Sequence, residues 1–308
     1  MFLRRGQCRA DGAAQVEVSA PAKLNLFLEI LAKRPDGFHD IETVMSPVSL
    51  YDTLTLTDDC SGELMLENDL SVAVAPPKSA EQQLPHGSEN IVVRALEALR
   101  RASGSERGAR VRLVKRIPLA AGMAGGSTDA AAALAAANAA WNLNLPDAKL
   151  AEIAATLGSD IPFFFAGGAA LCRGRGERIE PLGPLAPLHF AVVAPPEGLS
   201  TAAVYRTCRA PANPCRAESL IAAWRSGRYA ELGRLLHNRL QEAAEALSPW
   251  IERTARELHR WECLGHRMSG SGTSYFALCR SAVHARRVAA ALSRRGLGRT
   301  MALATCPS

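Results

Sequence analysis

The sequence lacks the features that would assign it to several large classes of protein. Its eight cysteines form no C-x-x-C pair, so neither a zinc ribbon nor a disulfide framework is indicated. No apolar run approaches the roughly 20 residues of a membrane span. Residues 1–14 also lack the apolar stretch that a secretory signal needs. We therefore expect a cytoplasmic protein with reduced thiols and no membrane association.

Charge of one sign is not concentrated anywhere in the chain. The 36 basic and 30 acidic residues give a net charge of +6, but they form no block of five or six like charges. This pattern gives no indication of nucleic-acid binding and is compatible with small anionic ligands. With 308 residues, 48% of them hydrophobic, the chain is long enough for two hydrophobic cores. We expect two domains, in a monomer or a homodimer.

The segment from Arg116 to Trp141 places three glycines before an alanine-rich stretch typical of a helix. It lacks the lysine of a P-loop, and the chain contains no dinucleotide-binding G-x-G-x-x-G and no H-R-D or D-F-G motif. Gly122, Gly125 and Gly126 suit a backbone that lies close to a ligand, and a helix N-terminus favours phosphate. The alternative is a plain helix start, capped by Ser127, Thr128 or Asp129.

Periodicity places strands before helices in the first part of the chain. Strand patterns cover "QVEVSA", "LNLFLEIL" and "DTLTLTD", and an amphipathic helix follows in "NIVVRALEALRRA". The strand "ARVRLVKRI" then leads to the alanine-rich helix and to a shorter helix over 146–157. This order predicts an α+β fold and not a regular βαβ alternation.

The second part of the chain begins after a proline-spaced junction between residues 181 and 187. We place the domain boundary there, which gives domains 1–183 and 184–308. The new strand "HFAVVAPP" follows, and "RMSGSGTSYFALC" predicts a strand, a turn and a strand. Helices are predicted over 217–226, 229–237, 239–260 and 282–295, with "TMALATC" as a last strand. A small α+β sandwich accommodates this pattern.

Three motifs occur in order along the chain: "PAKLNLFLEI", "PLAAGMAGGSTDAA" and "RMSGSGTSYFAL". Together they resemble the GHMP kinase superfamily of small-molecule kinases. The resemblance implies a ribosomal-protein-S5-like N-terminal domain, a ferredoxin-like α/β sandwich as C-terminal domain, and ATP with Mg²⁺ as cofactors. Within the superfamily, "DGFHDIETVMSPVSLYDTL" and "LGSDIPFFFAGGAALCRGRGE" look like the family that phosphorylates the 2-hydroxyl of 4-diphosphocytidyl-2-C-methyl-D-erythritol in non-mevalonate isoprenoid synthesis.

The resemblance implies a catalytic pair. Lys23 would lie in the active site beside Asp160, which would take the proton from the attacking hydroxyl. The lysine would keep this aspartate ionised. Taken alone, Lys23 reads as a solvated lysine on a strand edge, and Ser159 and Asp160 read as caps of a short helix opened by Pro162. Asp129 is interpreted as structural.

For the nucleotide, the resemblance implies contacts from the glycine loop and from Asn90, which would lie near adenine but whose position also suits a helix cap. Ser127 is the protein ligand suggested for Mg²⁺, which would otherwise bind the phosphates. Ala120, Ala121 and Ala124 stand where the family often has glycine, and they permit close approach if their φ angles stay negative. The implied ATP-binding residues are Asn90, Pro118, Gly122, Met123, Ala124, Gly125, Gly126, Ser127 and Thr128.

For the substrate, the resemblance implies a pocket for cytosine, in which Phe38 and Tyr205 stack on the two faces of the base and His39 reads its edge. The implied substrate-binding residues are Asn25, Phe38, His39, Thr201, Tyr205, Gly270 and Gly272. Two alternatives stay open: another GHMP kinase of the homoserine or mevalonate type, and a catalytically silent ligand sensor. The two aromatic rings argue against the first, and the intact catalytic pair and glycine loop argue against the second.

Overall fold

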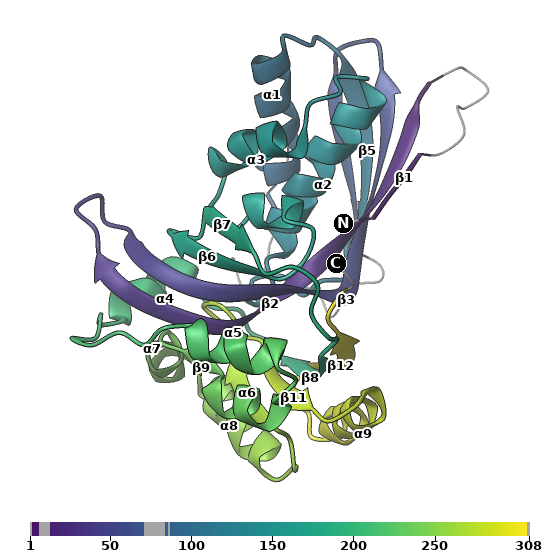
Figure 1. Ribbon diagram of the computed structural model, residues 1–308. Helices are drawn as coiled ribbons and strands as arrows, with labels where there is room; N and C mark the ends of the chain where they lie inside the picture. Colours follow the sequence, from purple (N-terminus) through teal and green to yellow (C-terminus); the bar gives the residue numbers. More distant parts are fainter. Residues whose placement is uncertain (1, 6–12, 71–83, 86, 307–308) are drawn as a thin grey trace.

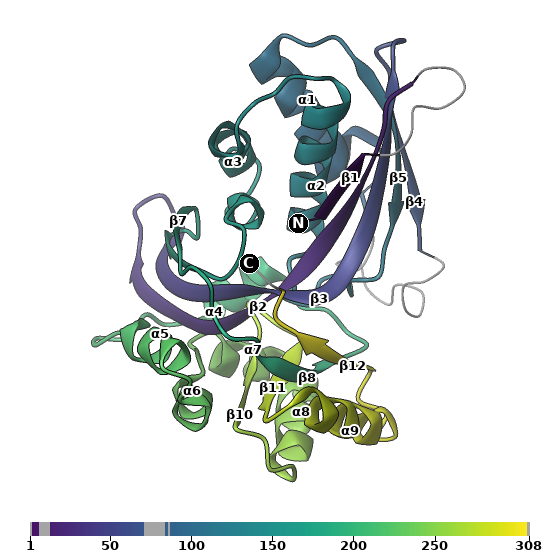
Figure 2. The ribbon, with the colours of Figure 1, turned by 45° about the vertical axis from the view of Figure 1, so that its right-hand side comes forward.

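Two β-sheets with helices packed on them make up the computed structural model, which describes residues 2–5, 13–70, 84–85 and 87–306. Residues 1 and 6–12 of the segment tested for a secretory signal lie outside these described residues. Figure 1 and Figure 2 show two long strands that run from the upper sheet down and across the molecule. No helix in the described part of the chain has the length and apolar character needed to cross a membrane.

The two long strands are β2 (Gln15–Lys33) and β3 (His39–Asp59), which pair antiparallel. In the first residues of β2, buried and open positions alternate, as "QVEVSA" predicts for a strand covered on one face. From Ala20 to Ile30 every residue is buried, because this part of the strand is covered on both faces. The two strand patterns predicted separately are therefore the two halves of one strand.

The first sheet is completed by short strands on both sides of this hairpin. Its path runs β1-β2-β3-β5-β4, with β6 paired to the early part of β3, β7 paired to β6, and β9 paired parallel to β2. Helices α1, α2 and α3 pack on one face of its upper part, as Figure 1 shows. The bounds are β1 (Phe2–Arg5), β4 (Leu64–Asp69), β5 (Gly108–Val114), β6 (Ala170–Gly174), β7 (Arg178–Pro181), β9 (His237–Asn238), α1 (Ile91–Ser103), α2 (Gly125–Ala140) and α3 (Asp147–Ala155).

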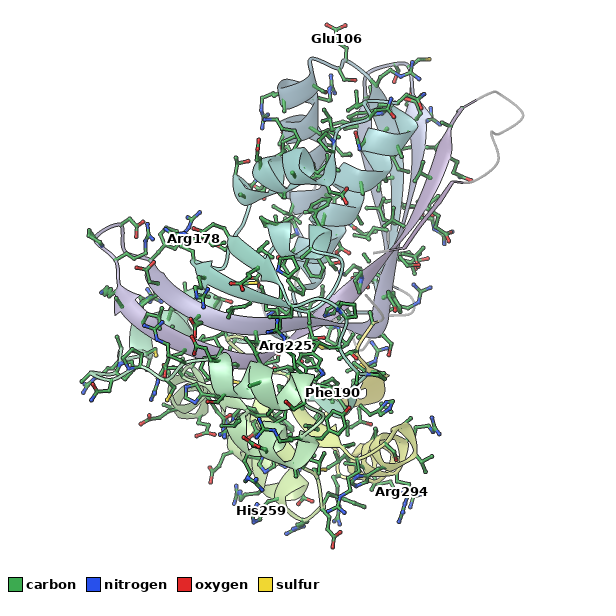
Figure 3. The ribbon with its side chains drawn as sticks, in the orientation of Figure 1. Glu106, Arg178, Phe190, Arg225, His259 and Arg294 are labelled. Atoms are coloured by element: carbon green, nitrogen blue, oxygen red, sulfur yellow. The ribbon has the colours of Figure 1, made fainter. Side chains whose placement is uncertain are left out.

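The second sheet has the order β10-β11-β8-β12 and lies with its helices below the lower arms of β2 and β3. Figure 3 shows Phe190 of β8 in this interior, whereas Glu106 points outward at the far end of the molecule. The bounds are β8 (His189–Ala194), β10 (Gly265–Met268), β11 (Tyr275–Cys279), β12 (Arg299–Ala304), α4 (Thr201–Thr207), α5 (Glu218–Arg225), α6 (Tyr229–Leu235), α7 (Gln241–Leu247), α8 (Pro249–His259) and α9 (Ala282–Ser293).

The helices differ from the predicted ones in two places. The single helix expected over 239–260 is two helices, α7 and α8, because Ser248 is extended (φ −148°, ψ 121°) and Pro249 starts a new helix. A proline biases the preceding residue toward extended backbone and cannot donate the next helical hydrogen bond. Helix α4 was not predicted, since its seven residues bury only Val204 completely and give little periodic signal.

The hydrophobic core does not divide cleanly at one residue. One buried cluster joins Leu24 and Val44 of the long hairpin to Phe190 and Trp224 of the second part of the chain. Strand β9 also returns from the second part to pair with β2. The boundary between residues 183 and 184 therefore stays a prediction, while the long hairpin connects both sheets.

Candidate active site

A cavity of about 840 Å³ lies where β2, the loop before α2, helix α4 and the β10–β11 loop meet. It brings together most of the residues that the sequence singles out, from six separate stretches of the chain. Those that line it are Lys23, Asn25, Phe38, His39, Pro118, Gly122, Met123, Ala124, Gly125, Gly126, Ser127, Asp160, Thr201, Tyr205, Gly270 and Gly272.

Lys23 and Asn25 lie on a stretch of β2 that has an irregular register on both sides. The pairing with β3 shifts between Pro21 and Ala22 and again between Asn25 and Phe27. Such irregularities redirect side chains and are common beside active sites. They explain how two polar side chains from the middle of a long buried strand come to line the cavity.

The ammonium group of Lys23 faces the carboxylate of Asp160, with Nζ 3.6 Å from Oδ2. It also donates to Asn25 Oδ1 at 2.5 Å and to the Gly122 carbonyl at 3.2 Å. Burial lowers the pKa of Lys23, and the neighbouring Asp160 opposes that shift. The Lys23 side chain is 4% exposed and that of Asp160 is 35% exposed, so the carboxylate remains accessible to a ligand. Lys23 is therefore not a solvated edge lysine.

Asp160 is also not a helix cap. The short 3₁₀ helix η3 (Pro162–Phe165) follows it, but the capping position is Ile161 and no side chain makes a capping hydrogen bond. The Asp160 carboxylate makes no capping hydrogen bond and is available to the cavity.

Hydrogen bonds orient the partner of Asp160, Lys23. Asn25 donates through Nδ2 to Thr43 Oγ1 at 2.8 Å, which leaves Oδ1 of Asn25 pointing at the ammonium group of Lys23.

The glycine loop before α2 and the β10–β11 loop are joined into one unit. Gly122 has φ +72°, and a Cβ there would collide with the carbonyl oxygen of Ser269. Ser269 Oγ donates to the Gly122 carbonyl at 3.0 Å, and Ser274 N donates to the Ala121 carbonyl at 3.0 Å. Glycine is required at 122 both for its backbone angle and for this close approach.

Two of the alanines in the loop overturn the expectation of negative φ. Ala120 has φ +48° and Ala124 has φ +55°, which are left-handed conformations that cost an alanine about 1–2 kcal/mol each. The contacts of the neighbouring residues 121 and 122 to the β10–β11 loop hold the segment in place. The loop therefore keeps a glycine-like backbone path with alanine side chains.

The start of α2 also differs from the plain helix start. Ala124 is the N-cap residue, and no side chain caps the helix, so the predicted caps at 127, 128 and 129 are wrong. The N–H groups of the first turn are not taken by a capping side chain and lie beside the cavity, which Gly125, Gly126 and Ser127 line. This is the arrangement in which a helix N-terminus binds an anion.

The far end of the cavity is built from side chains. Phe38 follows the "PDG" turn between β2 and β3, where Gly37 has φ +86° and Asp36 Oδ1 accepts from the Phe38 N–H at 3.1 Å. The His39 and Tyr205 rings lie 5.4 Å apart between centroids. Burial, and then the charge of Lys33, lower the pKa of His39, which favours the neutral imidazole. Burial raises the pKa of Tyr205.

Sequence reasoning missed three charged residues that line the cavity, Lys33, Arg175 and Arg206. The guanidinium carbon of Arg175 lies 4.9 Å from the centroid of the Phe38 ring, and Arg175 lines the cavity. Its neighbour Gly176 is close to Asp160, because a Cβ on Gly176 would be 3.5 Å from Asp160 Oδ1. The signal for Arg175 was present in "RGRGE", an arginine between two glycines directly after a strand.

Two predicted nucleotide residues do not line the cavity. Asn90 caps α1, with its side chain accepting from the Val92 N–H at 2.9 Å and donating to the Pro85 carbonyl. The capping interpretation of Asn90 is thus confirmed, and its contact to adenine stays a prediction. The Thr128 hydroxyl is fully buried and has no hydrogen-bond partner among the described residues. It faces the interior and not the cavity.

The chain is similar to kinases along most of its length. A 4-diphosphocytidyl-2-C-methyl-D-erythritol kinase from Pelotomaculum thermopropionicum is 43% identical over 277 residues, which cover 89% of this chain and 93% of that protein. The chain belongs to the 4-diphosphocytidyl-2-C-methyl-D-erythritol kinase family. A crystal structure of a 4-(cytidine 5'-diphospho)-2C-methyl-D-erythritol kinase is 34% identical, with a TM-score of 0.76 over 94% of this chain and 99% of that one.

The wider relationship of this kinase family is visible in the fold. The GHMP kinases N terminal domain matches residues 90–168, and the GHMP kinases C terminal domain matches residues 218–297. A homoserine kinase from Cytophaga hutchinsonii superimposes with a TM-score of 0.70 at 17% identity, covering 95% of each chain. The two-domain GHMP kinase fold expected from the three motifs is confirmed, as is an ATP-dependent small-molecule kinase.

Proposed function

We propose that this protein transfers the terminal phosphoryl group of ATP to the 2-hydroxyl of 4-diphosphocytidyl-2-C-methyl-D-erythritol. One observation carries the proposal above the others. The Lys23–Asp160 pair lies in a single cavity, with an uncapped helix N-terminus lining one part and aromatic side chains lining another. A phosphate donor and an aromatic base can thus be held on either side of one candidate base.

In this proposal Asp160 takes the proton of the attacking hydroxyl as the new oxygen–phosphorus bond forms and the bond to ADP breaks. Lys23, with Nζ 3.6 Å from the Asp160 carboxylate, would stabilise the negative charge on the attacking oxygen and on the transferred phosphoryl group. Its ammonium group donates hydrogen bonds to Asn25 Oδ1 and to the Gly122 carbonyl and forms an ion pair with Asp160, so it is held in place. Phosphoryl transfer requires positioning of the reactants and stabilisation of charge, and the fixed Lys23–Asp160 pair would supply both.

The nucleotide phosphates are proposed to lie across Gly122–Ser127, on the N–H groups of the loop and of the first turn of α2. Thr128 would contribute only through its place in the helix, because its hydroxyl is buried. Asn90 is proposed near adenine, beside the cap that it makes for α1.

The residues present fit a magnesium ion held mainly by the nucleotide. In the described part of the chain, the group of three potential ligands Glu29, Cys215 and His237 lies apart from the cavity lining. Mg²⁺ commonly binds substrate phosphates with one or two protein oxygens and water. Ser127 and Asp160 are the residues that would supply such oxygens, and the ion would neutralise charge on the transferred phosphoryl group.

The substrate is proposed to bind with its cytosine between Phe38 and Tyr205 and with His39 at the base edge. A neutral His39 can donate from one ring nitrogen and accept at the other, as reading a base edge requires. Arg175, which already lies over Phe38, is placed to balance the diphosphate charge of the substrate. Asn25, Thr201, Gly270 and Gly272 complete the proposed substrate contacts.

This assignment is tested by measuring the ADP that the protein forms from ATP in the presence of each acceptor of a small panel. The cytidyl substrate should support turnover, and homoserine, mevalonate and galactose should not, because none of them has an aromatic base for the ring pair. Turnover of another acceptor in the panel in place of the cytidyl compound would overturn the substrate assignment. Failure of every acceptor, with ADP still binding, would favour the ligand sensor.

A further inference from the structure

A buried asparagine lies behind the β10–β11 loop, outside the mechanism described so far. Asn238 ends the short strand β9 and is 6% exposed. Its Nδ2 donates to the carbonyls of Met268 and Gly270, both at 2.8 Å, and its Oδ1 accepts from the Leu240 N–H at 2.9 Å. Gly270 lines the cavity, whereas Asn238 is not among the described residues that do. Asn238 therefore contacts the loop without contacting the cavity.

The partners of Asn238 require an amide. A carbonyl can only accept a hydrogen bond and a backbone N–H can only donate one, so the two carbonyls fix the position of Nδ2 and the Leu240 N–H fixes that of Oδ1. An ionised aspartate of the same size would place an acceptor oxygen against both carbonyls. A buried polar group that loses its partner is costly, so the loop would have to move.

Asn238 is itself anchored on the strand that carries Lys23. Strand β9 pairs parallel with β2, and Asn238 lies opposite Leu28. The next residue, Arg239, donates its backbone N–H to the Leu28 carbonyl at 2.8 Å. Its guanidinium group donates to both carboxylate oxygens of the buried Glu29, at 2.7 and 2.9 Å. The position of the Asn238 amide is thus fixed relative to β2.

The β10–β11 loop lies directly against Lys23. A Cβ added to Gly270 would be 3.3 Å from Lys23 Nζ and 3.1 Å from the Gly122 carbonyl oxygen. Ser269 Oγ accepts from the Asn25 N–H at 3.2 Å and donates to the Gly122 carbonyl at 3.0 Å. The same carbonyl accepts from Lys23 Nζ at 3.2 Å. A displacement of the loop would therefore move an oxygen that helps to orient the ammonium group.

We propose that Asn238 is a positioning residue for phosphoryl transfer. By holding the β10–β11 loop against β2, it keeps the Gly122 carbonyl in place and thereby keeps Lys23 directed at Asp160. The inference rests on the proposed function, since it needs the Lys23–Asp160 pair to be catalytic. A catalytic group that is misplaced by about 1 Å can cost about 100-fold in rate, so a residue outside the cavity can govern turnover through the loop.

Asn238→Asp tests the proposal, because it keeps the size of the side chain and its acceptor for the Leu240 N–H but replaces the donor. We expect kcat to fall by about 10–100-fold. The KM values of ATP and of the cytidyl substrate should stay within about threefold of wild type, since the first turn of α2 and the ring residues Phe38 and Tyr205 lie on other segments. Steady-state kinetics measures this separation. A folded Asn238→Asp protein with wild-type kcat would overturn the proposal.

Asn138→Asp is the matched control. Asn138 on α2 makes the same kind of contacts away from the cavity, since its Nδ2 donates to the Leu145 carbonyl at 3.0 Å and its Oδ1 accepts from the Leu145 N–H at 2.9 Å. This variant should lose stability in urea unfolding but keep the wild-type kcat. Equal losses of kcat in the two variants would assign the effect to general destabilisation and contradict the proposal.

A double-mutant cycle shows whether Asn238 acts through Lys23. In a Lys23→Met background, Asn238→Asp should lower kcat by less than about threefold further, because the group that it positions is absent. A loss in the double variant equal to the product of the two single losses would place the effect elsewhere and contradict the proposal. Wild-type kcat in Lys23→Met itself would overturn the proposed catalytic pair. An impaired Lys23→Met beside a wild-type Asn238→Asp would overturn only the role of Asn238.

Ser269→Ala tests the same connection if Asn238→Asp does not fold. It removes the hydroxyl that joins the Asn25 N–H to the Gly122 carbonyl, so kcat should fall by about tenfold with both KM values unchanged. Ser248→Ala is its control, because the buried Ser248 hydroxyl has no hydrogen-bond partner among the described residues. Wild-type kcat in Ser269→Ala would show that the loop does not orient Lys23, and the proposal would be wrong.

Discussion

The two ends of the cavity differ in composition, because one presents mainly backbone and the other mainly side chains. The end proposed for the nucleotide consists of main chain: Gly122, Ala124 and Gly125 present backbone, and no side chain caps the helix that they lead into. The end proposed for the substrate consists of side chains, in which Phe38, His39, Tyr205 and Arg175 supply rings and charge. The Lys23–Asp160 pair, which we propose to be catalytic, lies on β2 and in the loop before η3, within the same cavity.

This difference indicates where kinase function and substrate choice reside. A fold shared with a homoserine kinase at 17% identity can preserve main-chain geometry, because backbone paths tolerate many sequences. It cannot preserve a particular set of ring and base-edge contacts. We therefore attribute phosphate binding to the backbone end and discrimination between acceptors to the side-chain end. Substitutions can alter each end of the cavity, and the Lys23–Asp160 pair, separately.

The largest expected effect comes from the catalytic pair, which belongs to neither end. Asp160→Asn keeps the size of the side chain and removes the base, so kcat should fall by about 10²–10⁴-fold. The KM values of ATP and substrate should stay close to those of wild type, since both ends of the cavity are unchanged. Steady-state kinetics with both substrates measures this separation.

Lys23→Met should lower kcat in the same direction, because the carboxylate loses the ammonium group beside it. Asp147→Asn, an exposed acid at the start of α3, serves as the control and should leave kcat unchanged. An Asp160→Asn protein that retains more than about a third of the wild-type kcat would remove Asp160 from the role of base.

The next effect concerns the backbone end. Gly122→Ala places a methyl group against the Ser269 carbonyl and requires φ +72° of an alanine, so the two loops must separate. We expect kcat/KM for ATP to fall by about 10–100-fold, because small displacements of positioning groups are costly. Gly167→Ala is the matched control, since Gly167 has a similar φ of +76° with no atom within 4 Å of the added Cβ. Equal losses in both variants would mean that only the backbone angle matters.

A smaller effect is expected at the side-chain end. Tyr205→Ala should weaken substrate binding by about 1–3 kcal/mol, the contribution of one stacked base, and leave the KM of ATP unchanged. Tyr205→Phe keeps the ring and should bind substrate as wild type does.

CMP should compete with substrate more strongly than UMP. Cytosine and uracil exchange a hydrogen-bond donor for an acceptor at the base edge that His39 is proposed to contact. Equal competition by CMP and UMP would contradict the cytosine pocket.

Sequence reasoning succeeded where a local pattern determines the structure. Alternation predicted the first part of β2, helical spacing predicted α1, and Asn90 was placed at a cap that its side chain makes. It failed where distant contacts decide. Nothing local to Lys115 shows that its side chain is buried between Asp52 and Asp129, and its charge alone favours an exposed site. The site residues carried by the ordered motifs reached the cavity except Thr128, whose hydroxyl is buried, whereas Arg175 depended on a loop whose path no periodicity describes.

The prediction of negative φ angles for the alanines of the glycine loop was wrong for the same reason. Their residue type favours negative φ, but the contacts of Ala121 and Gly122 to the β10–β11 loop impose the left-handed path on Ala120 and Ala124. The backbone end of the cavity therefore holds a strain that the sequence does not reveal and that the side-chain end does not share. Whether this strain serves nucleotide binding can be measured.

The smallest expected effect is that of Ala124→Gly. Glycine removes the cost of about 1–2 kcal/mol that a left-handed alanine pays, but it adds about 0.5–1 kcal/mol of conformational entropy to be lost on folding. The free energy of unfolding should thus rise by no more than about 1.5 kcal/mol. Ala121→Gly should lower it, because Ala121 is buried and has no positive φ to relieve. Urea unfolding of both variants measures whether each substitution raises or lowers the free energy of unfolding.

The KM of ATP then decides what the strain does. If the contacts to Ser269 and Ser274 alone hold the loop, Ala124→Gly should leave the KM of ATP within about twofold of wild type. We expect this result, because those contacts bracket the loop and remain in the variant. A rise of tenfold would correspond to about 1.4 kcal/mol, comparable with the strain itself, and would show that the methyl group of Ala124 restricts the loop to its binding conformation. The backbone end would then depend on a side chain after all.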